Sequence, residues 1–442
     1  MYTQESTPLF SASTFGRFRV PLKTAATLAA IAVAVFLSGC DPVGPQSESP
    51  EGPSSGDSPS DDELETQVQE ALGSQVTALQ VRDINVSEIA GELDRGETTL
   101  PYVTPENEVV EMTYESRPAN LRPDSVDTGV LREGPETSEQ VPLPPEQSYF
   151  LGDPENTFRL GGLTILDDDQ TMLRGLVRHS DYGISYIQSV NQILQTDDYP
   201  NRHVIYNIEN TGEVNIGDEE VYSSTNGNGS GQAGGAKLNV DRSASVVLDG
   251  DVQFYQKDPN TVWRRQESLF LAVQVTNGII EPISSDNWRL DLSIAGQEVW
   301  VSGGPSSTSH GTLMRRLEDP NYYLIHPLSP KQMHLFLVGY DVNGLAGRAG
   351  GIGTPSGGWG GGSGDNHLLS ETIFSLHMNR IILTHEVGHL IGGHHGNSVT
   401  GSCSGSMCGR SIMTPTVRPD NEYFFSDPND EEISDVVQST LP

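Results

Sequence analysis

Cysteine and basic residues are both scarce in this chain of 442 residues. Only Cys40, Cys403 and Cys408 are present, which is too few for a metal site built from cysteines. The 25 Lys and Arg residues face 60 Asp and Glu residues, which gives a formal net charge of −35. Phosphates would be repelled by such a chain, so the balance argues against nucleic acid as a partner and against an anionic lipid surface as the main target.

Long hydrophobic runs are also lacking, with one short exception near the start. Residues 24–39 are apolar and follow Arg17, Arg19 and Lys23, which is the pattern of an export signal. The run is too short for a comfortable membrane span. It ends in Leu-Ser-Gly before Cys40, and this resembles the bacterial lipobox, which implies that Cys40 is lipidated and becomes the first mature residue. An ordinary signal peptide with an incidental cysteine is the alternative.

Residues 1–237 are predicted to form several separate regions, and none of them contains a catalytic or metal-binding motif. After a lipoprotein signal peptide at 1–40, the Pro-, Ser- and acid-rich segment 41–62 predicts a disordered tether. Residues 63–222 form a propeptide-like region. The predictions within it and after it are one or two helices in 63–94, an extended connection in 101–148, an antiparallel β-rich part in 148–210 and a flexible linker at 223–237.

Residues 238–442 predict a domain in which strands and helices alternate. Such alternation is typical of an α/β or α+β fold with a mixed sheet. The expected elements are a strand in 245–257, a helix over part of 267–283, strands at 289–302 and 333–342, a helix at 368–393 and a helix start after Ser426.

One motif in this domain has metal-ligand spacing: His385-Glu386-x-x-His389-x-x-Gly392-x-x-His395. Two histidines four residues apart share one face of a helix and can bind one Zn²⁺. Gly392 lets the chain leave the helix, because glycine adopts a left-handed conformation at little cost, and His395 can then return to the metal. Glu386 can reach a metal-bound water. Three protein ligands and one open position are the composition of a catalytic zinc site.

Other residues near this motif, and elsewhere in the chain, are also of types that bind metals. His394 adjoins the third ligand and could replace it, although its spacing of five from His389 is less suitable. The Gly-rich stretch 347–366 with Asp365 could bind Ca²⁺, but a mobile rim of the active site is the favoured interpretation. The three aspartates at 167–169 are interpreted as a turn and not as a carboxylate site. Five further histidines are interpreted as surface, core, helix-face or loop residues without a role in the site: His310, His326, His334, His367 and His377.

A second feature, Met413 in the segment Ser-Ile-Met-Thr-Pro at 411–415, lies 18 residues past His395. The zinc motif followed by such a Met-turn is the metzincin signature. The sequence therefore resembles the metzincin zinc endopeptidases, and most closely the adamalysin/reprolysin branch. The branch resemblance is carried by Gly388 within the motif, the Cys pair before the Met-turn, and the segments 292–302 and 424–433.

The resemblance implies a metzincin-like catalytic domain at 238–442, with a mixed twisted sheet and a zinc-binding active-site helix, preceded by a β-rich propeptide-like domain. It implies that Met413 lies in a turn beneath the imidazoles and is not a ligand. Cys403 and Cys408 are expected to form a short loop disulfide, which export of the protein permits, and two free thiols are the alternative. An extended substrate would pair with a sheet edge expected in 336–352.

The sequence departs from the branch in two places that matter. Gly396 stands where the branch usually has Asp. No cysteine occurs in 63–222, so a cysteine thiolate cannot hold the enzyme inactive; inhibition, assistance of folding and simple spacing remain open as roles of that region.

The expected function is a zinc-dependent endopeptidase acting on extracytoplasmic proteins or peptides. One zinc ion held by His385, His389 and His395 would lower the pKa of its bound water and polarise the scissile carbonyl, with Glu386 as general base. The expected location is the cell envelope, through a lipid anchor at Cys40, or secretion. The alternatives are a non-catalytic surface or adhesion protein on a metalloprotease fold and a zinc hydrolase that cuts a non-peptide bond.

Overall fold

The computed structural model divides the chain into two compact units, residues 1–58 and 59–442, and describes residues of the second. No helix among these residues is long and apolar enough to cross a membrane. The described residues are 59–73, 76–123, 126, 128–134, 137–143, 146–152, 159–166, 172–179, 183–194, 196, 198–208, 214–215, 240–256, 288–317, 332–342, 345–351, 366–372, 376–395, 411–417, 425, 433–437 and 441.

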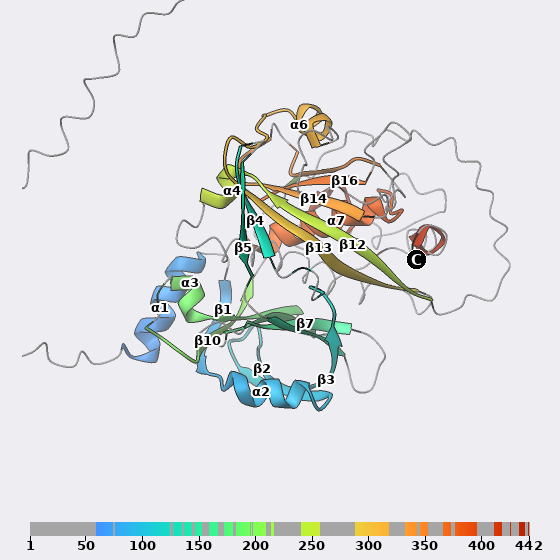
Figure 1. The fold of residues 1–442 in the computed structure, drawn as a ribbon. Helices are drawn as coiled ribbons and strands as arrows, with labels where there is room; N and C mark the ends of the chain where they lie inside the picture. Colours follow the sequence, from blue (N-terminus) through green and yellow to red (C-terminus); the bar gives the residue numbers. More distant parts are fainter. Residues whose placement is uncertain are drawn as a thin grey trace, which may run out of the picture. The chain divides into compact units, whose positions relative to one another are not determined.

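The N-terminal part of this unit is an antiparallel sheet of eight strands, in the order β1-β10-β9-β8-β7-β6-β3-β2 (Figure 1). Its helices are α1 (Asp61–Leu72), α2 (Val86–Leu93) and α3 (Val190–Leu194). Its strands are β1 (Val76–Asp83), β2 (Glu97–Val103), β3 (Val109–Ala119), β6 (Glu146–Gly152), β7 (Arg159–Leu166), β8 (Met172–His179), β9 (Gly183–Ser189) and β10 (Arg202–Ile208).

The β-rich part expected at 148–210 is therefore present, but the sheet begins much earlier. Helix α1 begins at Asp61, inside the expected tether, because Ser60 and Glu63 form a capping box at its start. Residues 76–83 form a strand where only helices were expected. The expectation of a Pro-rich connection at 101–148 was also wrong, since three whole strands and parts of β2 and β6 lie there. Isolated prolines are tolerated at strand ends and edges, and tertiary pairing outweighed local composition.

The second sheet is mixed and has seven strands in the order β15-β16-β14-β12-β13-β4-β5. Figure 1 shows β12, β13, β14 and β16 side by side in this twisted sheet. Its strands are β4 (Thr128–Glu133), β5 (Ser138–Pro142), β12 (Val240–Gly250), β13 (Trp288–Ser302), β14 (Gln332–Val338), β15 (Gly347–Ala349) and β16 (His367–Glu371). A shorter ladder joins β11 (Val214–Asn215) to β17 (Thr416–Val417). The described helices of this part are α4 (Val252–Gln256), α6 (His310–Leu317) and α7 (Leu376–Leu390), and residues 433–437 are also helical.

Alternate residues of β14 serve two separate hydrophobic clusters, as strand periodicity requires. Met333, Leu335 and Leu337 pack in the cluster that contains the apolar residues of α7. Phe336 and Val338 pack with the apolar residues of α6 on the other side. The sheet is thus covered on both faces, which explains why β14 reads as a continuous apolar run.

Two expectations for residues 238–442 need correction, and a third lies outside the described residues. The helix expected at 368–393 begins only at Leu376, because 367–371 form strand β16, parallel to β14. The sheet is mixed as expected, but two of its strands, β4 and β5, come from the region assigned to the propeptide. The helix expected over part of 267–283 lies outside the described residues.

The fold buries one histidine of the N-terminal sheet in its neutral form. His203 is 1% exposed; its Nδ1 lies 3.0 Å from the Asn201 carbonyl oxygen, and the Leu173 N–H donates to its Nε2 over 3.3 Å. Both contacts suit the neutral ring with the proton on Nδ1. Burial lowers the pKa of His203 from 6.5 to about 4, against a smaller opposing effect of the Asn201 carbonyl.

We expect His203→Gln to reduce the acid sensitivity of folding. Between pH 6.5 and 4 the unfolded chain binds a proton at this residue and the folded chain does not, so His203 makes the free energy of unfolding fall by about 3 kcal/mol as the pH drops through that window. Glutamine can donate to Asn201 and accept from Leu173 without titrating. Melting temperatures at pH 7 and pH 5 should differ less in the variant than in the parent, and equal differences would contradict this account.

Candidate metal centre

The candidate centre is built on α7, whose last two turns carry His385 and His389. The helix ends in a Schellman motif: the Gly393 N–H donates to the Gly388 carbonyl over 2.8 Å, and the Gly392 N–H to the His389 carbonyl over 3.0 Å. Gly392 has φ of +114°, a conformation that other residues rarely adopt. The chain therefore reverses at Gly392 and brings His395 back over the helix.

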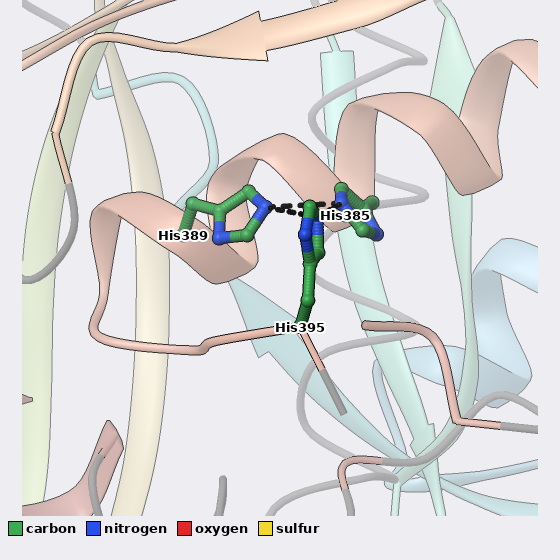
Figure 2. A group of neighbouring side chains, drawn as sticks. All are labelled: His385, His389 and His395. Carbon is green, nitrogen blue, oxygen red and sulfur yellow. Dashed lines mark hydrogen bonds between the residues drawn. The ribbon is translucent and has the colours of Figure 1, made fainter. Parts of the chain in front are cut away.

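Figure 2 shows the rings of His385, His389 and His395 pointing toward one another. Their three Nε2 atoms form a triangle with sides of 3.0, 3.1 and 3.2 Å. Within the described part of the chain, this is the one group of three potential ligands close enough to share a metal ion. His394, the alternative third ligand, is not a member of the group.

The hydrogen bonds of the other ring nitrogens determine what the Nε2 atoms can do. Nδ1 of His385 lies 2.7 Å from the Ile412 carbonyl oxygen, and Nδ1 of His389 lies 2.8 Å from the Gly393 carbonyl oxygen. A carbonyl oxygen only accepts, so both Nδ1 atoms carry the proton and both Nε2 atoms present lone pairs. Lone pairs converging at 3.0 Å repel unless a cation lies between them.

The size of this triangle would suit a zinc ion. Nitrogen ligands about 2.0–2.1 Å from a tetrahedral zinc lie about 3.4 Å apart, close to the separations in this triangle. Burial lowers the pKa of His385 to about 3 and the pKa of His389 well below its ordinary value. The imidazoles are therefore neutral near pH 7, which is the form that binds metals.

Met413 packs directly beneath the helix that carries the ligands. It is fully buried, and a Cβ placed on Gly388 would lie 2.5 Å from its Sδ and 3.2 Å from Phe425. A Cβ placed on Gly393 would lie 3.2 Å from the Met413 methyl group. The turn that carries Met413 also supplies, through Ile412, the carbonyl that orients His385. Glycine at 388 thus allows the turn and the helix to approach closely.

Glu386 is 2% exposed and is held by strand β15, a contact that the sequence did not reveal. Burial raises the pKa of the Glu386 carboxyl well above its usual range; a hydrogen bond from the Ala349 N–H and the charge of Arg348 oppose this. A Cβ on Gly347 would lie 2.5 Å from Oε1 of Glu386. The short strand therefore fixes the carboxylate from one side. No sequence signal beyond the glycines of this stretch pointed to that contact.

Strand β15 also defines one edge of the seven-stranded sheet as described. It pairs antiparallel with β16 through Gly347, Arg348 and Ala349. The sheet edge expected in 336–352 is thus confirmed in position. Pairing of a substrate with that edge stays a prediction.

The other buried histidines that the structure describes do not join the centre. His334 and His367 are buried core residues on neighbouring strands, with their Nδ1 atoms 2.8 Å apart, and His310 is buried on α6. His377 lies on α7. The other positions lie outside the described residues: Cys40, Cys403, Cys408, Asp167, Asp168, Asp169, His326, Asp365 and Gly396.

Comparisons with known proteins give little beyond this geometry. No protein-family model and no curated protein matches the chain. The crystal structure of metalloproteinase-II from Bacteroides fragilis is 12% identical and matches with a TM-score of 0.43 over 81% of this chain and 97% of that one. The structure of a chaperone–substrate complex is 11% identical and matches with a TM-score of 0.32 over 62% of this chain and 37% of that one.

Proposed function

We propose that this protein is a zinc-dependent endopeptidase of the metzincin type. The observation that carries the proposal is the convergence of three Nε2 atoms, of which those of His385 and His389 are unprotonated, together with a buried glutamate at the position after the first ligand. A zinc ion held by His385, His389 and His395 would supply a Lewis acid for the scissile carbonyl and lower the pKa of a coordinated water to about 7.

In this proposal Glu386 is the general base. Its carboxylate accepts a proton from the attacking water and delivers it to the leaving amine nitrogen as the peptide C–N bond breaks. Burial raises the pKa of the Glu386 carboxyl well above its usual range, while the Ala349 N–H and a bound dication would keep the carboxylate ionised.

The proposed substrate is an extended peptide or an unfolded segment of a protein. It would add to the edge of β15, whose other side pairs with β16. A metal-binding surface protein without activity is the competing function. Purified protein that holds zinc but cleaves no unfolded protein or peptide library would support that alternative.

We expect His395→Ala to lose the metal and His394→Ala to keep it. The two histidines are adjacent, but only His395 places a ring nitrogen against both other ligands. Zinc content by elemental mass spectrometry should be about one per chain for the parent and for His394→Ala, and well below one for His395→Ala. Zinc at 100 times its dissociation constant should stabilise the parent by about 2.7 kcal/mol. The opposite pattern would make His394 the third ligand.

We also propose export and lipidation at Cys40, which rest on the sequence alone. The mature protein would then lie outside the cytoplasm, attached to a membrane through the lipid on Cys40, and its protein substrates would be found there. Mass spectrometry of the mature N-terminus would give a diacylglyceryl cysteine at position 40, and an unmodified or different first residue would contradict the proposal.

A further inference from the structure

We infer that the N-terminal sheet is a permanent part of the folded protein, which stays bound to residues 240–441 even when the chain between them is cut. The edge of strand β13 is then a binding surface, and its partner is the hairpin β4–β5 of the same chain. This inference does not depend on the proposed peptidase activity. It bears on the propeptide-like region 63–222, for which the sequence left inhibition, assistance of folding and simple spacing open.

The first contact that supports it is the strand pairing itself. β4 lies parallel to β13, with Val130 opposite Glu298 and Arg132 opposite Trp300. β5 then covers the outer side of β4 and forms the edge of this sheet as described. Loss of the hairpin would leave β13 as an open edge with one exposed row of unpaired backbone groups, a surface prone to unwanted pairing.

The second contact is a buried ion pair across that same ladder. Nε of Arg132 lies 2.7 Å from Oε2 of Glu298, and each side chain is 1% exposed. The Arg132 guanidinium carbon also lies 5.0 Å from the centroid of the Trp300 ring. Separation of the two parts of the chain would leave the Glu298 carboxylate on β13 without its ion-pair partner. Breaking such a buried pair is strongly unfavourable.

A third contact joins the N-terminal sheet to the helix of the metal centre. Arg380, five residues before His385 on α7, is 5% exposed, and its guanidinium carbon lies 4.5 Å from the ring centroid of Tyr186 on β9. Tyr186 stacks on Tyr206 of β10, with ring centroids 5.4 Å apart. A buried guanidinium over an aromatic face is a favourable desolvated contact, so the N-terminal sheet supports the first turns of α7.

The core and a short ladder continue across the same boundary. One hydrophobic cluster contains Leu64 and Val204 of the N-terminal part together with Ile381 and Val387 of α7. Strand β11 at 214–215 pairs with β17, which follows the Met413 turn. Dissociation of the N-terminal part would expose the apolar side chains of this cluster to water. A propeptide that is removed after folding would instead be expected to cover a mainly polar surface.

The test is to cut the full-length protein in solution. The sequence Gly229–Gly235 within the Gly- and Ser-rich stretch 223–237 is replaced by the recognition site of a sequence-specific protease, and the cut protein is passed over a gel-filtration column under native conditions. We expect both fragments to elute together at the position of the uncut protein. Separate elution of the two fragments would overturn the inference, whether or not the protein hydrolyses peptides.

Variants of the cut protein test the ion pair. Arg132→Met should lower the urea concentration at which the fragments separate, because it leaves the Glu298 carboxylate buried without its partner. The double variant Arg132→Met with Glu298→Met should bring that urea concentration most of the way back to the parental value, because neither buried charge remains. Arg202→Met is the matched control: Arg202 pairs with Asp61 and Asp83, all within the N-terminal part. An equal effect of Arg132→Met and Arg202→Met would show that the ion pair does not hold the fragments together.

Discussion

Replacement of Glu386 by glutamine is expected to lower kcat by about 10²- to 10⁴-fold while zinc content stays at one per chain. Glutamine has nearly the same shape and can still occupy the space beside Gly347 and Ala349, but it cannot accept the proton of the attacking water. The three ligands and their carbonyl partners, Ile412 and Gly393, are untouched. Peptide hydrolysis and elemental analysis on the same preparation separate the two quantities.

The outcome distinguishes the two candidate functions. A zinc-loaded parent that cleaves peptides and a zinc-loaded Glu386→Gln that does not would support the endopeptidase. Hydrolysis at the parental rate in Glu386→Gln would remove Glu386 from its proposed role. Absence of hydrolysis in both proteins, with zinc present, would favour the non-catalytic surface protein.

Replacement of Gly347 by alanine is expected to have the second largest effect, although residue 347 is neither a ligand nor a general base. Gly347 has an ordinary strand conformation, so alanine is not excluded by the backbone. Its Cβ would lie 2.5, 2.8 and 2.9 Å from Oε1, Cγ and Cδ of Glu386, so the carboxylate must move. Displacement of a catalytic group by about 1 Å can cost 10²-fold, and we expect kcat to fall by about 10- to 100-fold with zinc retained.

A matched glycine provides the control for this substitution. A Cβ on Gly311 of α6 meets nothing within 4 Å, so Gly311→Ala should leave kcat unchanged. In a Glu386→Gln background, Gly347→Ala should add little further loss, because both changes act on the same carboxylate. Parental kcat in Gly347→Ala would mean that β15 does not position Glu386.

The metal centre shows how far local sequence can predict a site. The spacing of His385 and His389 follows from helix periodicity, and the return of His395 follows from the freedom of Gly392 to take positive φ. Both are properties of a few consecutive residues. Zinc as the metal and hydrolysis as the reaction remain proposals, since they rest on chemistry that these residues permit.

The N-terminal region shows where local sequence is insufficient. Residues 76–83 carry apolar residues at spacings that suit a helix, yet they form β1 because β10 supplies its hydrogen-bonding partner. Likewise 367–371 look like the first turn of a long helix, yet they pair with β14. A strand is stabilised by partners that are distant in sequence, so its formation is poorly encoded in any short window.

The three histidines, the glutamate beside them and the glycine that turns the chain could be predicted from eleven consecutive residues, because they depend on helix geometry and backbone freedom within that stretch. Three other features depend on contacts between distant residues. β15 places Gly347 and Ala349 against Glu386, Ile412 orients His385, and the hairpin β4–β5 completes the sheet through Arg132 and Glu298. These contacts join residues 27 to 166 positions apart, and sheet pairing and burial select them only when the whole chain is folded.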